Sequence, residues 1–234
     1  MSAIDNSFIN AENLAVGDKN VVGNQQHFYS AVPAASATPV EPTRPGGGPL
    51  TRVFVVHGRD HQVRTAAFDL LRALRVYPWE WEQVVADLGQ GAPYSGDVVA
   101  HAVHHSRAAL VLLTPDDLAQ LHPDLHTPGE TRHETTPNGQ PRPNVLIELG
   151  MVLAAYPERS LIAEFGTLRP IGDISGRNVI RFDGTEKSIR ISLHKIVERL
   201  RQAGCAVDDS GDDWRSPERF LRLDAYQRSA GRSA

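Results

Sequence analysis

Short apolar runs that alternate with amphipathic segments dominate the chain between residues 51 and 204. The runs at 53–56 and 108–113 contain no polar side chain, which is typical of strands buried on both faces. Strands that alternate with helices form a parallel sheet with right-handed crossovers and helices on both faces. The pattern therefore predicts an α/β domain, with its ligand site beyond the carboxyl ends of the strands.

Individual elements follow from the same periodicities. Strands are expected at 53–56, 76–85, 108–113, 160–164 and 178–182. Helices are expected where apolar residues recur at three- and four-residue steps, at 63–74, 98–103, 145–153 and 189–200. Pro143 suits the first turn of the third helix, and Gly204 suits the end of the fourth. The stretch 114–142, which contains several Pro, Gly and His residues, is expected to be an insertion loop of low order.

Both ends of the chain differ in composition from this domain. Residues 1–50 are a polar, Asn- and Gly-rich arm that ends in a Pro/Gly linker, and we expect the arm to be disordered because it holds too few apolar groups to offset its ordering entropy. Residues 205–234 are expected to be a charged C-terminal tail with a short helix after Ser216, whose Phe220, Leu221 and Leu223 could pack on the domain or on a partner.

Charge and cysteine content exclude several classes of protein. The 24 Lys and Arg residues against 28 Asp and Glu residues give a net charge of −4, which argues against a nucleic-acid partner. The longest apolar runs are too short to span a membrane, and residues 1–5 lack the basic start of a signal peptide. The single cysteine, Cys205, excludes a disulfide framework and a Cys-rich zinc site. We therefore expect a cytoplasmic protein without a membrane partner.

A polar cluster, His57, Gly58, Arg59 and Asp60, directly follows the first expected strand, and Thr114 follows the third. Glycine lets the backbone approach a ligand closely, and the polar groups beside it suit a ribose or a phosphate. The alternative is a tight turn in which Asp60 only caps the next helix. The chain has no GxGxxG or Walker A motif, so neither a Rossmann fingerprint nor a P-loop is present.

Asn144 and Glu148 lie four residues apart and share one side of the third expected helix. At roughly 100° per residue, Glu148 lies about 100° from Leu149, where the apolar stripe is centred. A carboxylate at the edge of a buried helix face suits a binding cleft. The alternative is a surface glutamate that pairs with a neighbouring arginine.

Histidines raise the question of a metal site. His101 and His105 have the four-residue spacing that can share a metal ion. The sequence has no HExxH motif, no cysteine partner and no obvious third carboxylate ligand. We therefore interpret this helix face as solvated and expect no metal.

Four segments occur in a fixed order: VFVVHGRD (53–60), VLLTPDD (111–117), NVLIELG (144–150) and DISG (173–176). Together they resemble the bacterial TIR-like family of predicted nucleotide-binding proteins, whose members serve as effector domains in antiphage systems triggered by cyclic nucleotides. The resemblance covers residues 51–204. It implies a flavodoxin-like TIR fold, a parallel five-stranded sheet with helices on both faces, and NAD⁺ glycohydrolase activity.

The resemblance also implies residue roles. Glu148 would be the catalytic glutamate, and His57, Gly58 and Asp60 would belong to the loop that lines the nucleotide pocket. Arg59, Thr114 and Asn144 complete the expected substrate-binding set, and NAD⁺ would be a substrate, with no cofactor. The chain departs from the family at Ser95–Asp97 and Ala100, where a Gly-Arg-Thr-like turn and a glutamate are common, and in the greater length between Asp117 and Asn144.

A single glutamate fits the implied chemistry. Cleavage of the nicotinamide–ribose bond releases a neutral pyridine, so the leaving group needs no proton. Ordinary glycosidases need two carboxyl groups because their leaving alkoxide must be protonated. One carboxylate can stabilise the oxocarbenium-like ribose and orient its hydroxyls.

Partners are expected from the same resemblance. Catalysis in the family generally depends on assembly, so we expect self-association of the domain and an upstream sensor protein. Residues 8–30 contain two similar triplets six residues apart, Val16-Gly17-Asp18 and Val22-Gly23-Asn24. This repeat resembles the amyloid-signalling motifs of bacterial effectors and could add to the assembly of the protein. The alternative for this segment is a disordered polar arm.

Two other functions remain open at this point. A nucleoside deoxyribosyltransferase-like enzyme would share the α/β frame and place a glutamate beside an N-glycosidic bond. A non-catalytic TIR adaptor would bind a nucleotide or a partner without releasing nicotinamide.

Overall fold

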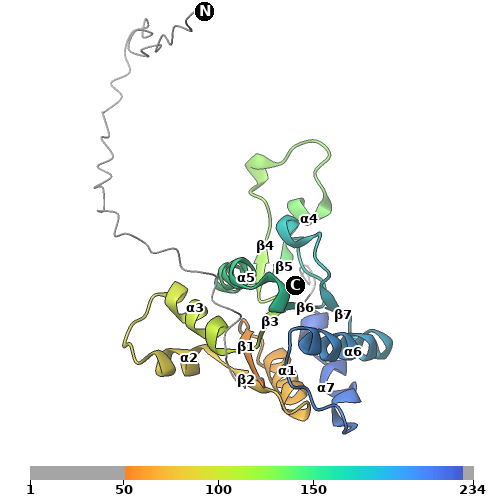
Figure 1. The fold of residues 1–234 in the computed structure, drawn as a ribbon. Helices are drawn as coiled ribbons and strands as arrows, with labels where there is room; N and C mark the ends of the chain where they lie inside the picture. Colours follow the sequence, from red (N-terminus) through yellow and green to blue (C-terminus); the bar gives the residue numbers. More distant parts are fainter. Residues whose placement is uncertain (1–50, 229–234) are drawn as a thin grey trace, which may run out of the picture. The chain divides into compact units, whose positions relative to one another are not determined.

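The computed structural model describes residues 51–228 (Figure 1). Its centre is a five-stranded sheet in the order β2-β1-β3-β6-β7, in which every neighbouring pair is parallel. The strands are β1 (Arg52–Val56), β2 (Tyr77–Trp79), β3 (Ala108–Leu113), β6 (Ser160–Phe165) and β7 (Ile180–Phe182). The order reverses at β1, so a crevice is expected where the chain leaves β1 and β3. The predicted parallel α/β sheet is confirmed.

Alternating strand residues build two separate cores. Val53 and Val55 of β1 face one core, together with α1 (His61–Ala73) and α6 (Glu186–Gln202). Phe54 and Val56 face the other core, together with α2 (Trp81–Leu88), α3 (Ser95–His105) and α5 (Pro143–Ala155). All six residues of β3 are buried, as expected for a central strand covered on both faces.

Helix ends agree with the signals in the sequence. Pro143 occupies the first turn of α5, where its missing N–H costs nothing. Gly204 has φ of +83°, and the N–H of Cys205 donates to the carbonyl of Leu200 at 2.8 Å. This is the left-handed termination that glycine favours after a helix.

The predicted strand 76–85 is wrong in its second half. β2 ends at Trp79, and Glu80 then opens α2 with a capping box, because its side chain and that of Gln83 each accept a backbone N–H. The apolar residues from Trp81 onward therefore lie on a helix. Pro78 is confined to β2, an edge strand, where proline is tolerated.

The stretch 114–142 is also ordered, contrary to the expected loop. It carries β4 (Asp117–Ala119) and β5 (Asn138–Gln140), which pair antiparallel, with a 3₁₀ turn η1 (Pro123–Leu125) and the helical turn α4 (Arg132–Thr135) between them. We call residues 117–140 the flap; it extends beyond the sheet next to α5 (Figure 1). Polar contacts order it, including an ion pair between Glu134 and Arg169.

The C-terminal segment corrects the domain boundary expected at Gly204. Residues 205–228 form η4 (Asp213–Arg215), α7 (Glu218–Leu221) and η5 (Asp224–Tyr226). Trp214 and Phe220 are almost fully buried, and the ring of Phe220 stacks 5.1 Å from that of Phe182 at the end of β7. Phe220 and Leu223 pack on the domain as the sequence suggested, and the core continues through Ala225.

None of the helices within residues 51–228 is long and apolar enough to cross a membrane. The expectations for the N-terminal arm, including the repeat within residues 8–30, lie outside the described residues.

We predict that Trp214→Ala destabilises the domain by about 3–5 kcal/mol, the usual cost of truncating a buried aromatic side chain. Urea unfolding measures this difference. Tyr77→Ala is the matched control, because Tyr77 is 65 % exposed and its loss should change the free energy of unfolding by less than about 1 kcal/mol. A similar small effect for both variants would mean that residues 205–228 are a dispensable tail.

Candidate active site

A cleft of about 440 Å³ lies where β1 ends. One wall is the end of β1 and the loop after it, and the other is the first two turns of α5. The lining side chains come from four segments and are Phe54, Val55, Val56, His57, Gly58, Arg59, Trp81, Ser95, Arg142, Asn144, Val145, Ile147 and Glu148. The cleft therefore occupies the crevice that the strand order predicts.

Glu148 is the acidic residue of this lining. It is half-buried, and burial raises the pKa of its carboxyl from 4.5 to about 7. Among residues 51–228 it has no ion-pair partner, so the surface glutamate paired with an arginine is not what the structure contains. An unpaired, partly desolvated carboxylate in a cleft is the arrangement expected of a group that meets a cation or a catalytic step.

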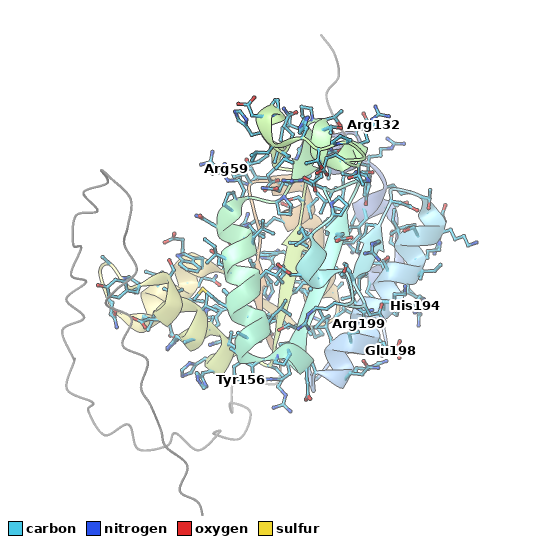
Figure 2. The ribbon with its side chains drawn as sticks, turned by 90° about the horizontal axis from the view of Figure 1, so that it is seen from above. Arg59, Arg132, Tyr156, His194, Glu198 and Arg199 are labelled. Carbon is cyan, nitrogen blue, oxygen red and sulfur yellow. The ribbon has the colours of Figure 1, made fainter. Side chains whose placement is uncertain are left out.

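The loop after β1 lies opposite α5. The Nδ1 atom of His57 lies 2.9 Å from the carbonyl oxygen of Gly58, and its Nε2 atom lies 4.0 Å from the carboxylate of Glu80. The side chain of Arg59 is exposed, and Figure 2 shows it near the start of α5 and the flap. The loop thus presents an imidazole and a guanidinium to the cleft.

Gly58 is required by the close approach of a neighbouring side chain. A Cβ atom built at residue 58 would lie 1.7 Å from the Oδ2 atom of Asp116, so any other amino acid would displace either this carboxylate or the loop. The same Oδ2 atom accepts the backbone N–H of Arg59 at 2.9 Å. The hydroxyl of Thr114 donates to the Oδ1 atom of Asp116 at 2.8 Å.

Two of the predicted site residues lie behind the cleft instead of in its lining. Asp60 is 5 % exposed; it accepts the N–H of Val63 at 2.9 Å, which caps α1, and it pairs with Arg228 at 2.7 Å. Thr114 is 2 % exposed, and its hydroxyl donates to Asp116, which accepts the N–H of Arg59 in the loop. The structure brings His57, Gly58, Arg59 and Asn144 together with Glu148, and it gives Asp60 the capping role that was the alternative.

Eight lining residues were not predicted as site residues from the sequence: Phe54, Val55, Val56, Trp81, Ser95, Arg142, Val145 and Ile147. Trp81 was assigned to a strand, so its position at the start of α2 was not foreseen. Arg142 is the cap residue of α5, and its position directly before Pro143 was the available signal. Ser95 belongs to the stretch that departs from the family pattern, and it nevertheless lies in the cleft.

The histidines on α3 contact other protein groups. His101 bonds to Asp87 of α2 at 2.9 Å, and its ring stacks on His105 with the centroids 4.0 Å apart. Within residues 51–228, no three His, Cys, Asp or Glu side chains are grouped so that they could hold a metal ion.

Comparison with protein-family models gives a match over residues 52–184 to the TIR domain of the CAP12/Pycsar effector proteins. The match covers more than half of the chain. This protein belongs to the CAP12/Pycsar effector TIR family. The matched part of the TIR domain contains all five strands, the flap and α5, and it ends before α6 and the C-terminal segment. No curated protein matches the chain.

Burial of Glu148 should make its charge costly for stability. The folded-state pKa of about 7 lies above the ordinary value of 4.5, so the folded protein holds a proton that the unfolded chain loses, and stability falls as pH rises between these values. We predict that Glu148→Gln is more stable than wild type by about 1–3 kcal/mol at pH 8, with no such gain at pH 4.

Urea unfolding at the two pH values measures this effect. Glu158→Gln is the matched control, because Glu158 is exposed and its charge should cost little at either pH. A gain from Glu148→Gln that is equal at pH 4 and pH 8 would contradict a charge-based cause.

Proposed function

We propose that this TIR domain is an NAD⁺ glycohydrolase that cleaves the nicotinamide–ribose bond with Glu148 as the catalytic residue. The observation that carries the proposal is an unpaired carboxylate with a pKa raised to about 7 in the cleft at the end of β1. Membership of an effector TIR family supports the same reading. The positively charged nicotinamide ribose would be the ion-pair partner that Glu148 lacks among residues 51–228.

The chemistry needs one carboxylate and one water molecule. The bond between C1′ of the ribose and the pyridinium nitrogen breaks, and its electron pair neutralises the nicotinamide, which leaves without a proton. Positive charge develops on the ribose, where the Glu148 carboxylate stabilises it electrostatically. Water then attacks C1′ and loses a proton, which gives ADP-ribose. Attack by an adenine nitrogen in place of water would give a cyclic isomer.

The other lining residues would bind the remainder of NAD⁺. Arg59 and Arg142 carry guanidinium groups suited to the diphosphate, and His57 and Asn144 can exchange hydrogen bonds with ribose hydroxyls. The indole of Trp81 offers a flat apolar surface to a ring. In this proposal Asp60 and Thr114 shape the loop and make no contact with the substrate.

We further propose that the protein is an antiphage effector that becomes active on assembly, with an upstream sensor supplying the signal. The family description as an effector supports this role. Self-association would involve the TIR domain, and residues 8–30 are the second candidate segment.

We predict that Glu148→Gln lowers nicotinamide release from NAD⁺ by at least about 100-fold, because a neutral amide cannot offset the developing charge. Chromatography of the products formed by concentrated full-length protein measures this rate. Glu158→Gln is the matched control and should retain wild-type turnover. Undiminished turnover by Glu148→Gln would exclude this residue from catalysis.

The same chromatographic assay, run with deoxynucleosides beside NAD⁺, separates the proposed function from its two alternatives. Exchange of bases between deoxynucleosides, with no attack on NAD⁺, would indicate a deoxyribosyltransferase-like enzyme. Oligomers that bind NAD⁺ but release no nicotinamide, even when concentrated, would indicate an adaptor.

The raised pKa of Glu148 predicts the pH dependence of the reaction. Because the carboxylate form is the active one, kcat/KM should rise with pH and level off above about 7, the pKa in the free protein. A bound pyridinium cation stabilises the carboxylate, so the corresponding rise in kcat should occur at lower pH. Initial rates from pH 5 to pH 9 test both points, and activity that falls over this range would contradict the assignment.

A further inference from the structure

We propose that Asp116 and Asp117, two adjacent residues where the flap begins, are positioning residues that hold the two walls of the cleft. The substrate that they serve rests on the proposed function, whereas the contacts themselves do not. Neither residue lines the cleft, so each would act through a neighbour.

Asp116 holds the wall formed by the loop after β1. One carboxylate oxygen accepts the backbone N–H of Arg59 at 2.9 Å, and the other accepts the hydroxyl of Thr114 at 2.8 Å. Thr114 is itself fixed, because it is buried at the end of the central strand β3. The carboxylate therefore links the end of β3 to the backbone of the loop at Arg59.

The packing at Gly58 shows how closely the loop and Asp116 fit. The carboxylate occupies the space that a side chain at residue 58 would need. The absent Cβ of Gly58 leaves room for the carboxylate in this position, and the carboxylate accepts the next backbone N–H, that of Arg59. The contact therefore holds the backbone of the loop at Arg59.

Asp117 reaches the opposite wall. Its Oδ1 atom lies 3.5 Å from the Nη1 atom of Arg142, the cap residue of α5. Arg142 lines the cleft, and Glu148 lies six residues further along, about 9 Å along the helix axis. Asp117 also pairs in register with Gln140 of β5, so the end of the flap leads directly into α5.

A single dipeptide therefore contacts the Arg59 loop and the start of the Glu148 helix. Its contacts would set the spacing between the groups that bind the substrate and the carboxylate that acts on it. A residue that only arranges binding groups affects the ground state and the transition state alike, which raises KM and leaves kcat nearly unchanged.

The first test is steady-state kinetics of full-length Asp116→Ala. KM for NAD⁺ should rise about tenfold, the usual effect of losing a hydrogen bond to a charged acceptor, with kcat changed less than about threefold. Asp116→Asn should restore most of the wild-type KM, because its amide oxygen can still accept the N–H of Arg59. Asp117→Ala should raise KM to a lesser extent, since its 3.5 Å separation from Arg142 is longer than either contact of Asp116.

Asp124→Ala is the matched control, because Asp124 is an exposed flap aspartate whose side chain is close only to His122. It should behave as wild type. If Asp116→Ala does not fold, Thr114→Val removes one of the same contacts without removing the charge, and a rise in KM is expected there too.

The second test measures how well the loop after β1 is held in place, and it does not depend on catalysis. Amide hydrogen exchange at Arg59, followed by NMR, should be about tenfold faster in Asp116→Ala than in wild type or Asp116→Asn, because the acceptor is gone. Wild-type protein that neither binds nor cleaves NAD⁺ would refute the proposed function, while this measurement still decides the positioning role. Unchanged exchange at Arg59, or a loss confined to kcat, would overturn the inference.

Discussion

Burial of the central strands on both faces is the constraint from which the rest of the domain follows. A strand such as β3, with all six residues buried, leaves no place for a polar side chain along its length. Polar chemistry can gather only where the strands end, and the reversal of strand order at β1 opens a crevice there. The residues His57, Arg59 and Glu148 meet at this crevice because the sheet allows them nowhere else near its centre.

Glu148 shows the cost of placing a charge in such a crevice. Its carboxylate gives up hydration without gaining an ion-pair partner among residues 51–228, and its pKa rises accordingly. Nearby acidic groups are treated differently: Asp60 is more deeply buried, but it is paired with Arg228 and caps a helix. Asp60 thus has the partners expected of a structural carboxylate, whereas Glu148 lacks them, which is why we propose a binding or catalytic role for Glu148.

Local patterns predicted the parts of the fold that local physics controls. The strand at 53–56, the helix that Pro143 opens and the stop at Gly204 all depend on periodicity or on one residue's backbone preference. The failures involve distant contacts. The flap is ordered by pairing between residues about twenty positions apart, and the C-terminal segment is ordered by packing against β7 and α6. In the candidate site, Glu148 and the Arg59 loop were predicted from the sequence and line the cleft, whereas no role was predicted for Asp116, because its partners at residues 58 and 59 lie far away in the chain.

The last described turns of the chain have a consequence for how the domain could be transplanted. The family match ends at residue 184, but Arg228 neutralises the buried Asp60 at the start of α1, one residue from the cleft loop, and Asp224 and Gln62 exchange two hydrogen bonds beside it. A chimera that contained only the matched region would leave Asp60 without its counter-ion. It would also expose the side of α1 that contacts α7 and η4. The segment that has to be transferred is therefore longer than the segment that matches the family, because residues beyond 184 stabilise the start of α1.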